Sequence, residues 1–138
     1  MMKKLTALLT ALFLLLSATA LADDVIHIGI IQFAEHGSLD NCRIGFIEGL
    51  AEEGFVEGEN VVFDIQNAQA DTAISAQIAD VMAGKYDMIC AIATPAAMAA
   101  FNAAEDAGIP VIYTAVSDPV SAMLASADGK NPGNITGT

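Results

Sequence analysis

Four short stretches of this sequence place aromatic, charged or hydrogen-bonding side chains directly after apolar segments. An aromatic ring beside a carboxylate could hold an apolar or cationic part of a ligand. An amide suits hydrogen bonding to a neutral polar group. We therefore predict a small-molecule binding site built from residues of these four stretches. The predicted site residues are Phe33 and Glu35, then Gln69, then Thr94, Pro95 and Ala96, and finally Ser117 and Asp118.

The third stretch carries the most specific signal. Threonine followed by proline predicts the start of a helix, with Thr94 as the N-cap and Pro95 at the first helical position. The next peptide N–H groups, near Ala96 and Ala97, would lack helical partners and would lie at the positive end of the helix dipole. Such a helix start suits a carboxylate or phosphate. Ordinary helix capping needs the same Thr-Pro pair, so the sequence leaves both interpretations open.

The other stretches have similar alternatives. Glu35 and His36 could form a solvated turn, the amide of Gln69 could bond loop backbone, and Asp118 could cap the segment after it. Ser117, His36 and Asp118 could be named as a catalytic triad, but no G-x-S-x-G elbow surrounds the serine. No glycine-rich nucleotide loop follows the first apolar segment. We therefore predict a binding protein, not an enzyme, with no cofactor.

The two cysteines, Cys42 and Cys90, fall on the apolar face of a predicted helix and inside a predicted strand. Free cysteine is commonly buried as a small hydrophobe, so two buried thiols are expected. An oxidising compartment would also permit a bridge between them. Together with His27 or His36 they show no recognisable ligand spacing, so no metal site is predicted.

The elements that must position these residues alternate between strand and helix. Apolar runs at 25–31, 61–67, 86–92 and 110–116 predict strands, and 135–138 resembles the start of a fifth. Helices are predicted at 39–53, with Ser38 as N-cap and Gly54 at its end, at 72–83 and at 95–107, with a short helix possible at 120–127. This order predicts an α/β fold with an open parallel sheet and helices on both faces. Right-handed crossovers would then bring all four stretches to the carboxyl edge of the sheet, where open parallel sheets bind ligands.

The first 22 residues have the composition of a secretory leader. Lys3 and Lys4 precede an uncharged run, and Ala20-Leu21-Ala22 resembles a signal peptidase site. Cleavage after Ala22 would give a periplasmic or otherwise extracytoplasmic protein; an uncleaved anchor is the alternative. The formal charge would change from −12 to −14, because Lys3 and Lys4 are the only charges removed. Such an acidic surface argues against nucleic acid and anionic membranes as partners. Residues 23–138 are expected to form one domain.

Several segments along the mature chain, in order, resemble one known family. They are Ile28–His36, Gly45–Leu50, Asn60–Gln69, Ala91–Ala97, Thr114–Val120 and Asn134–Thr138. Together they are similar to the tryptophan/tyrosine-type family of ABC-transporter substrate-binding proteins. Gly37 departs from the proline usual in that family, and Gly133 follows Pro132 without the common second glycine.

The resemblance implies the first lobe of a type 1 periplasmic-binding-protein fold, with the second lobe missing and the chain ending at the approach to the hinge. It implies an ABC-importer component that binds an amino acid, aromatic by preference, or a similar small carboxylate between two lobes. A membrane permease would be its partner, and the complete protein would be a monomer. Thr94 and the N–H groups near Ala96 would take the ligand carboxylate, and Phe33 would contact its side chain.

Other functional classes remain as alternatives. A ligand-sensing extracytoplasmic module of a membrane receptor could use the same lobe, and a membrane span with a signalling segment downstream would identify it. A secreted hydrolase would require turnover that depends on Ser117. A transcription-factor ligand domain shares the architecture, but the predicted export and the lack of a helix-turn-helix argue against it.

Overall fold

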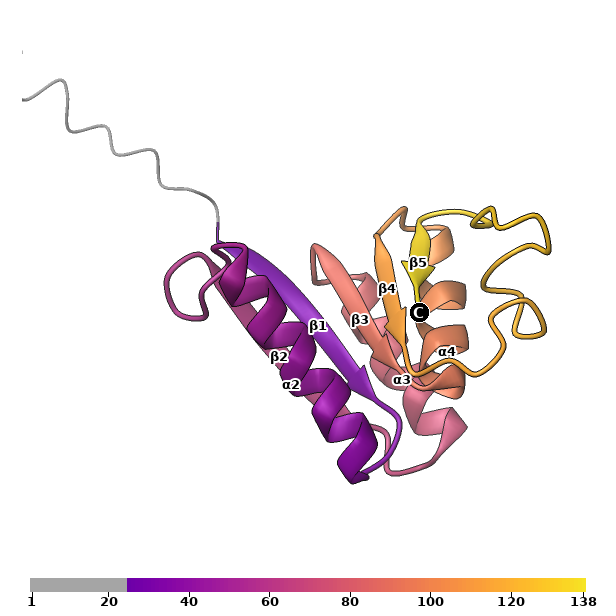
Figure 1. Cartoon of the computed structure of the whole chain (residues 1–138), viewed down its shortest axis with the longest axis horizontal. Coiled ribbons are helices and arrows are strands. Elements are labelled where there is room, and N and C mark those ends of the chain that lie inside the picture. The colour runs from indigo at the N-terminus through magenta and orange to yellow at the C-terminus, as the bar shows by residue number, and fades with distance from the viewer. Residues whose placement is uncertain (1–24) are drawn as a thin grey trace, which may run out of the picture.

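The structure is a computed structural model that describes residues 25–138 (Figure 1). Five parallel strands form one sheet in the order β2-β1-β3-β4-β5. The strands are β1 (Ile26–Gln32), β2 (Val61–Asn67), β3 (Met88–Ile92), β4 (Val111–Thr114) and β5 (Ile135–Gly137), and the helices are α2 (Gly37–Glu52), α3 (Thr72–Ala83) and α4 (Thr94–Glu105). The predicted leader and its cleavage site lie outside the described residues.

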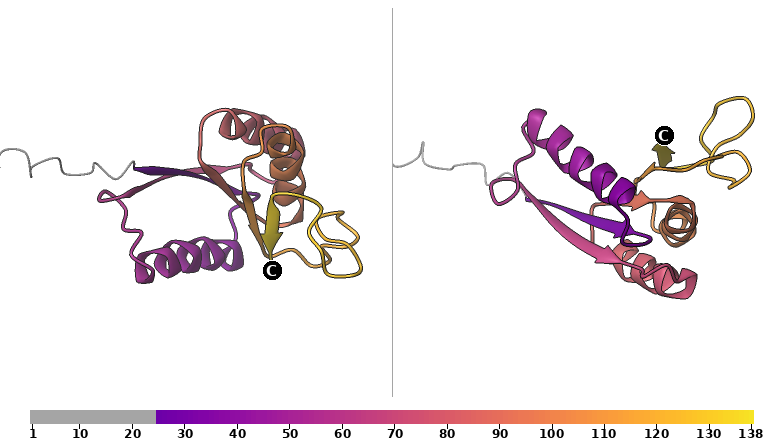
Figure 2. Two further views of the ribbon diagram at one scale, coloured as in Figure 1. Left: turned by 90° about the horizontal axis from the view of Figure 1, so that it is seen from above. Right: turned by 60° about the horizontal axis from the view of Figure 1, so that its bottom comes forward.

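Helices lie on both faces of the sheet, as predicted. Helix α2 covers one face, while α3 and α4 lie side by side on the other (Figure 2). Strand side chains alternate between the two faces, so Ile28, Ile30 and Cys90 pack toward α2, and Ile31 and Ala91 join the core beneath α3 and α4. The buried β3 therefore has apolar side chains on both faces, as its continuous apolar run predicted.

Helices α2 and α4 start one or two residues before their predicted positions. Helix α2 begins at Gly37, and its N-cap is His36 instead of Ser38; the Nδ1 atom of His36 accepts a hydrogen bond from the Ser38 N–H at 3.2 Å. Helix α3 has the predicted bounds. Its N-cap Asp71 accepts from the N–H groups of Ala73 and Ile74 at 2.7 and 3.1 Å. The ends of α2 and α4 also fall slightly before their predicted positions.

The short helix considered at 120–127 does not form. Residues 118–125 instead make a series of turns, in which the carbonyl of Pro119 accepts from the N–H groups of Leu124 and Ala125. Met123 interrupts any helical path because its φ is +60°. Buried Ala122 and Leu124 still belong to the same apolar cluster as residues of α4. The Ala122 N–H donates to the Asp118 carbonyl as in a helix, but the turn does not continue as one.

Both cysteines lie where the sequence placed them. Cys42 is partly buried in α2, Cys90 is buried in β3, and both are free thiols that belong to the same apolar cluster. No helix within residues 25–138 combines the length and apolar composition that a membrane span requires.

Candidate functional site at the carboxyl edge

The ends of four strands are aligned at one edge of the sheet. Gln32 at the end of β1 is in register with Asn67 of β2 and with Ile92 of β3, and Ile92 is in register with Thr114 of β4. The loops that follow these strands therefore start side by side, as the parallel topology predicted. Strand β2 lies on one side of β1, and β3, β4 and β5 follow on the other side, so the strand order reverses between β1 and β3. Open parallel sheets bind ligands at such a switch point.

Backbone hydrogen bonds connect these loops to one another. The Phe33 N–H donates to the Ile92 carbonyl at 3.2 Å, and the Ala70 N–H donates to the Phe33 carbonyl at 2.8 Å. The Ala93 N–H in turn donates to the Thr114 carbonyl at 3.0 Å. The predicted site segments thus form one continuous edge whose relative positions are set by the main chain.

Unfavourable backbone conformations are concentrated at this edge. Gln69, Ala70, Ala93 and Ala115 all have φ between +55° and +81°. Ala93 combines φ +81° with ψ +154°, a region that is populated almost only by glycine. Among the described non-glycine residues, Met123 is the single other case of positive φ. Strained residues of this kind persist where the surroundings fix them, commonly at ligand sites.

Helix α4 begins at this edge without a side-chain cap. The structure corrects the predicted cap: Ala93 occupies the N-cap position, Thr94 is the first helical residue and Pro95 follows it. Alanine has no side-chain acceptor, and helices α2 and α3 are both capped by side chains. The start of α4 therefore keeps its positive dipole end and the hydroxyl of Thr94 available to an anion.

The eight predicted site residues differ in how accessible they are. Thr94 and Pro95 are partly buried, whereas Ala96 has no exposed surface, so a ligand at this edge would meet Thr94 and Pro95 first. Phe33 is partly buried and packs against the α3–α4 core. The remaining four are solvent-exposed: Glu35, Gln69, Ser117 and Asp118.

Asp118 already has a structural role in its own loop. Its two carboxylate oxygens accept hydrogen bonds from the N–H and the hydroxyl of Ser121, at 2.9 and 2.6 Å. These hydrogen bonds, that from the Ser121 hydroxyl first, lower the pKa of the Asp118 carboxyl. The residue therefore caps the turn after β4, which is one of the two interpretations that the sequence allowed.

A polar cluster behind the first loop was not among the predicted site residues. Gln32, only 3% exposed, bonds through its side chain to Asp40, to Arg43 and to the main chain of Ala34. Two features of the sequence could have indicated this cluster. Gln32 is a polar residue at the end of an apolar strand, and Arg43 is one of only three lysines and arginines after the leader. Sequence spacing did not reveal that the two meet.

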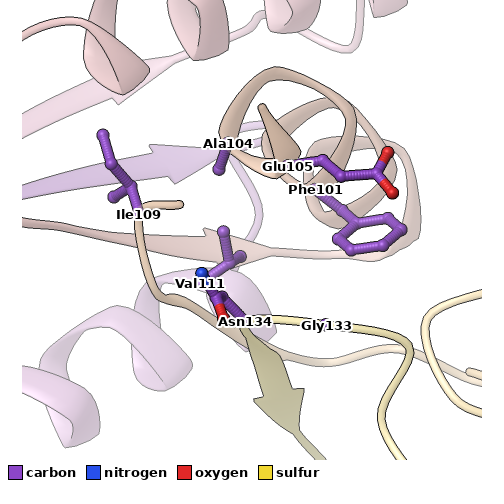
Figure 3. A pocket seen from close by; sticks show the side chains of 7 residues that line it. All are labelled: Phe101, Ala104, Glu105, Ile109, Val111, Gly133 and Asn134. Atoms are coloured by element: carbon purple, nitrogen blue, oxygen red, sulfur yellow. The ribbon is translucent and has the colours of Figure 1, made fainter. Parts of the chain in front are cut away.

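Hollows elsewhere on the lobe contain none of the eight predicted residues. One of about 100 Å³ lies beneath α4 at the opposite edge, between Phe101, Ile109 and Asn134 (Figure 3). A second, of about 340 Å³, lies between β2 and α3, and a third, of about 560 Å³, is a shallow depression at the start of β4 and β5. The candidate site is thus separate from these three hollows and is defined by the strand ends and loops of the carboxyl edge.

A family model described as ABC transporter substrate binding protein matches residues 27–138. The chain belongs to this family. The tyrosine-binding protein of Clostridioides difficile (strain R20291), a curated relative, is 47% identical to the present chain over 113 residues. The match covers 81% of the chain but only 32% of that relative, so the chain spans about a third of its length.

Solved structures of substrate-binding proteins have the same lobe. A ligand-free, open substrate-binding protein with adhesive properties from Clostridium difficile matches with a TM-score of 0.77 and 48% identity, over 82% of this chain and 38% of that one. An ABC domain in complex with L-Trp from Streptococcus pneumonia matches with a TM-score of 0.76 and 37% identity, over 83% and 38%. A conserved domain protein from Vibrio cholerae gives a TM-score of 0.78 at 38% identity, over 83% and 38%.

Proposed function

We propose that this protein is the extracytoplasmic receptor of an ABC importer and that it binds an aromatic amino acid, or a similar small carboxylate, at the carboxyl edge of this lobe. The observation that carries the proposal is the uncapped start of α4, which offers the Thr94 hydroxyl and a helix dipole to a carboxylate. A relative described as tyrosine-binding and a related domain in complex with L-Trp support the aromatic side chain.

In this proposal the lobe supplies one wall of the ligand site. The tyrosine-binding relative, of which the match covers only 32%, has room for a second lobe, which would close over the ligand by a hinge motion. Phe33 would contact the ligand side chain, with Gln69 and the Ser117–Asp118 loop at the rim. The protein binds its ligand without transforming it and presents it, as a monomer, to a membrane permease. Residues 1–22 would direct export and be cleaved after Ala22.

The test is a titration of the purified protein with L-tyrosine and L-tryptophan by calorimetry, with the Thr94→Ala variant alongside. Saturable binding of one of them is expected, and Thr94→Ala should weaken it about tenfold, because a hydrogen bond to a charged group is lost. Thr72→Ala is the matched control, since Thr72 is the first residue of α3, whose start is already capped by Asp71. Unchanged affinity in Thr94→Ala would remove this carboxylate site. Failure of both amino acids to bind would reject the aromatic ligand.

A further inference from the structure

The side chain of Gln32 connects the end of β1 to the loop that follows it. Its Nε2 donates to the carbonyl of Ala34 and to Oδ1 of Asp40, both at 2.8 Å. Its Oε1 accepts from Nε of Arg43 at 3.0 Å. Both amide protons and the amide oxygen are therefore used, which suits a group that is only 3% exposed. Ala34 is held at its carbonyl, directly between Phe33 and Glu35.

Arg43 holds this arrangement from helix α2. Its Nη2 lies 3.7 Å from Oδ1 of Asp40, the same oxygen that accepts from Gln32. The arginine side chain is 25% exposed and that of Asp40 is 36% exposed, so water screens the pair only in part. The guanidinium therefore aligns the side-chain amide of Gln32. It also stabilises the carboxylate of Asp40, which accepts a hydrogen bond from that amide. A point charge such as lysine could not donate in the same fixed direction.

The main chain carries the influence of Gln32 further along the edge. Its carbonyl accepts from the Ala68 N–H at 2.9 Å, so the loop after β2 starts from Gln32 as well. The next residue, Phe33, bonds through its main chain to Ile92 and Ala70. Gln32 and Phe33 are thus joined through their main chains to the loop after β2 and to the end of β3.

We propose that Arg43 and Gln32 are positioning residues of the ligand site, with Arg43 acting through the amide of Gln32 to fix residues 33–36. This assignment rests on the proposed function for its effect on ligand, but its effect on the loop is independent of any ligand. A binding site at a sheet edge gains affinity when its loops are held in the binding conformation before the ligand arrives. Without the cluster, the loop that carries Phe33 would sample other conformations.

The first experiment compares Arg43→Met with wild type by hydrogen exchange and mass spectrometry, in the ligand-free protein. The two hydrogen-bonded amides of residues 33–38, those of Phe33 and Ser38, should exchange about tenfold faster or more in the variant, while peptides from β3 and β4 are unchanged. Lys130→Met is the matched control, because it removes one positive charge from an exposed ion pair with Asp128 that does not contact the edge. Arg43→Lys, which keeps the charge, should give a smaller change. Exchange at 33–38 that is unchanged in Arg43→Met overturns the proposal.

The second experiment is a double-mutant cycle on affinity for L-tyrosine and L-tryptophan. Arg43→Met and Gln32→Leu should each weaken binding about tenfold. In the Gln32→Leu background, Arg43→Met should add little, because its partner is already gone. Fully additive effects would mean that Arg43 does not act through Gln32. If neither amino acid binds the wild type while exchange at 33–38 still depends on Arg43, the aromatic ligand fails and the positioning role stands.

Discussion

At the scale of single residues, the carboxyl edge is built from alanines in conformations that glycine adopts more easily. Ala93 has φ +81° and ψ +154°, and Ala70 and Ala115 also have positive φ. An alanine at such a position costs folding free energy. Alanine also allows the loop fewer conformations than glycine would. These alanines therefore lower the stability of the lobe but hold the edge loops in fixed conformations.

Ala93→Gly should therefore stabilise the protein by about 1 kcal/mol, because relief of backbone strain exceeds the added entropy of the unfolded chain. Urea unfolding of the purified protein measures this difference. Ala99→Gly, in the interior of α4, is the control and should destabilise by about 1 kcal/mol. Equal destabilisation by both substitutions would show that Ala93 is not strained.

Cys90 should be unreactive in the folded protein. Burial, with a smaller contribution from nearby Cys42, raises the pKa of the Cys90 thiol from 9.0 to about 12. The thiolate is the reactive form, so in Cys42→Ser the remaining thiol should react with a disulfide reagent at pH 8 only as fast as the protein unfolds. Between pH 9 and about 12, the Cys90 thiol keeps its proton in the folded state and loses it in the unfolded state. The associated stability is therefore complete below pH 9 and is lost as the pH rises toward 12. Rapid, stoichiometric reaction at pH 8 would contradict this.

Some site residues could be predicted from sequence and others could not. Thr94-Pro95 marks a helix start by local steric rules alone, so its place at the edge followed once the strands were recognised. The cap at Ala93 was missed because it depends on an unusual φ that alanine does not signal. The contact of Gln32 with Arg43 joins a strand end to the second turn of a helix, and its geometry depends on how α2 packs on the sheet.

At the scale of elements, burial explains which predictions succeeded. Strand β2 and helix α3 have the predicted bounds, since polar Asn67 ends the apolar pattern of β2 and Gly84 follows that of α3. Strands β3 and β4 are shorter than their apolar runs, because Tyr86 and Val116 are buried by packing outside the ladder. The segment at 120–127 has helical composition, but it packs as turns around buried Ala122 and Leu124. Tertiary packing there outweighs weak local propensity.

Close packing of α3 on β1 depends on Gly29. A Cβ atom at this position would lie 2.5 Å from the sulfur of Met82 and 3.2 Å from the ring of Tyr86. Gly29→Ala should destabilise the protein by about 1–3 kcal/mol, because buried Met82 and the helix must shift. Gly45→Ala in α2 is the control: a Cβ there meets nothing within 4 Å, and alanine should stabilise the helix by about 0.5–1 kcal/mol. Thermal and urea unfolding report both changes; a neutral Gly29→Ala would mean that α3 is loosely packed.

At the scale of the whole molecule, excess negative charge opposes folding. The sequence has 17 acidic and 5 basic residues. Within residues 25–138, two ion pairs form, Arg43–Asp40 and Lys130–Asp128. Glutamates at 48, 52 and 53 lie near the C-terminal end of α2, where the helix dipole is also negative and no basic residue occupies the last turn. Repulsion among carboxylates is therefore only weakly compensated.

Salt should accordingly stabilise the protein. Raising sodium chloride from about 0.05 to 0.5 M shortens the screening length several-fold, so the melting temperature should rise by a few degrees. The variant Glu52→Gln removes one charge beside the negative end of α2. It should melt at a higher temperature in low salt and gain less from added salt, since part of the repulsion is already gone. Asn41→Gln, at an exposed position of the same helix, changes no charge and controls for substitution alone. A melting temperature that falls with sodium chloride would instead mean that the two ion pairs contribute more than the repulsion among seventeen carboxylates.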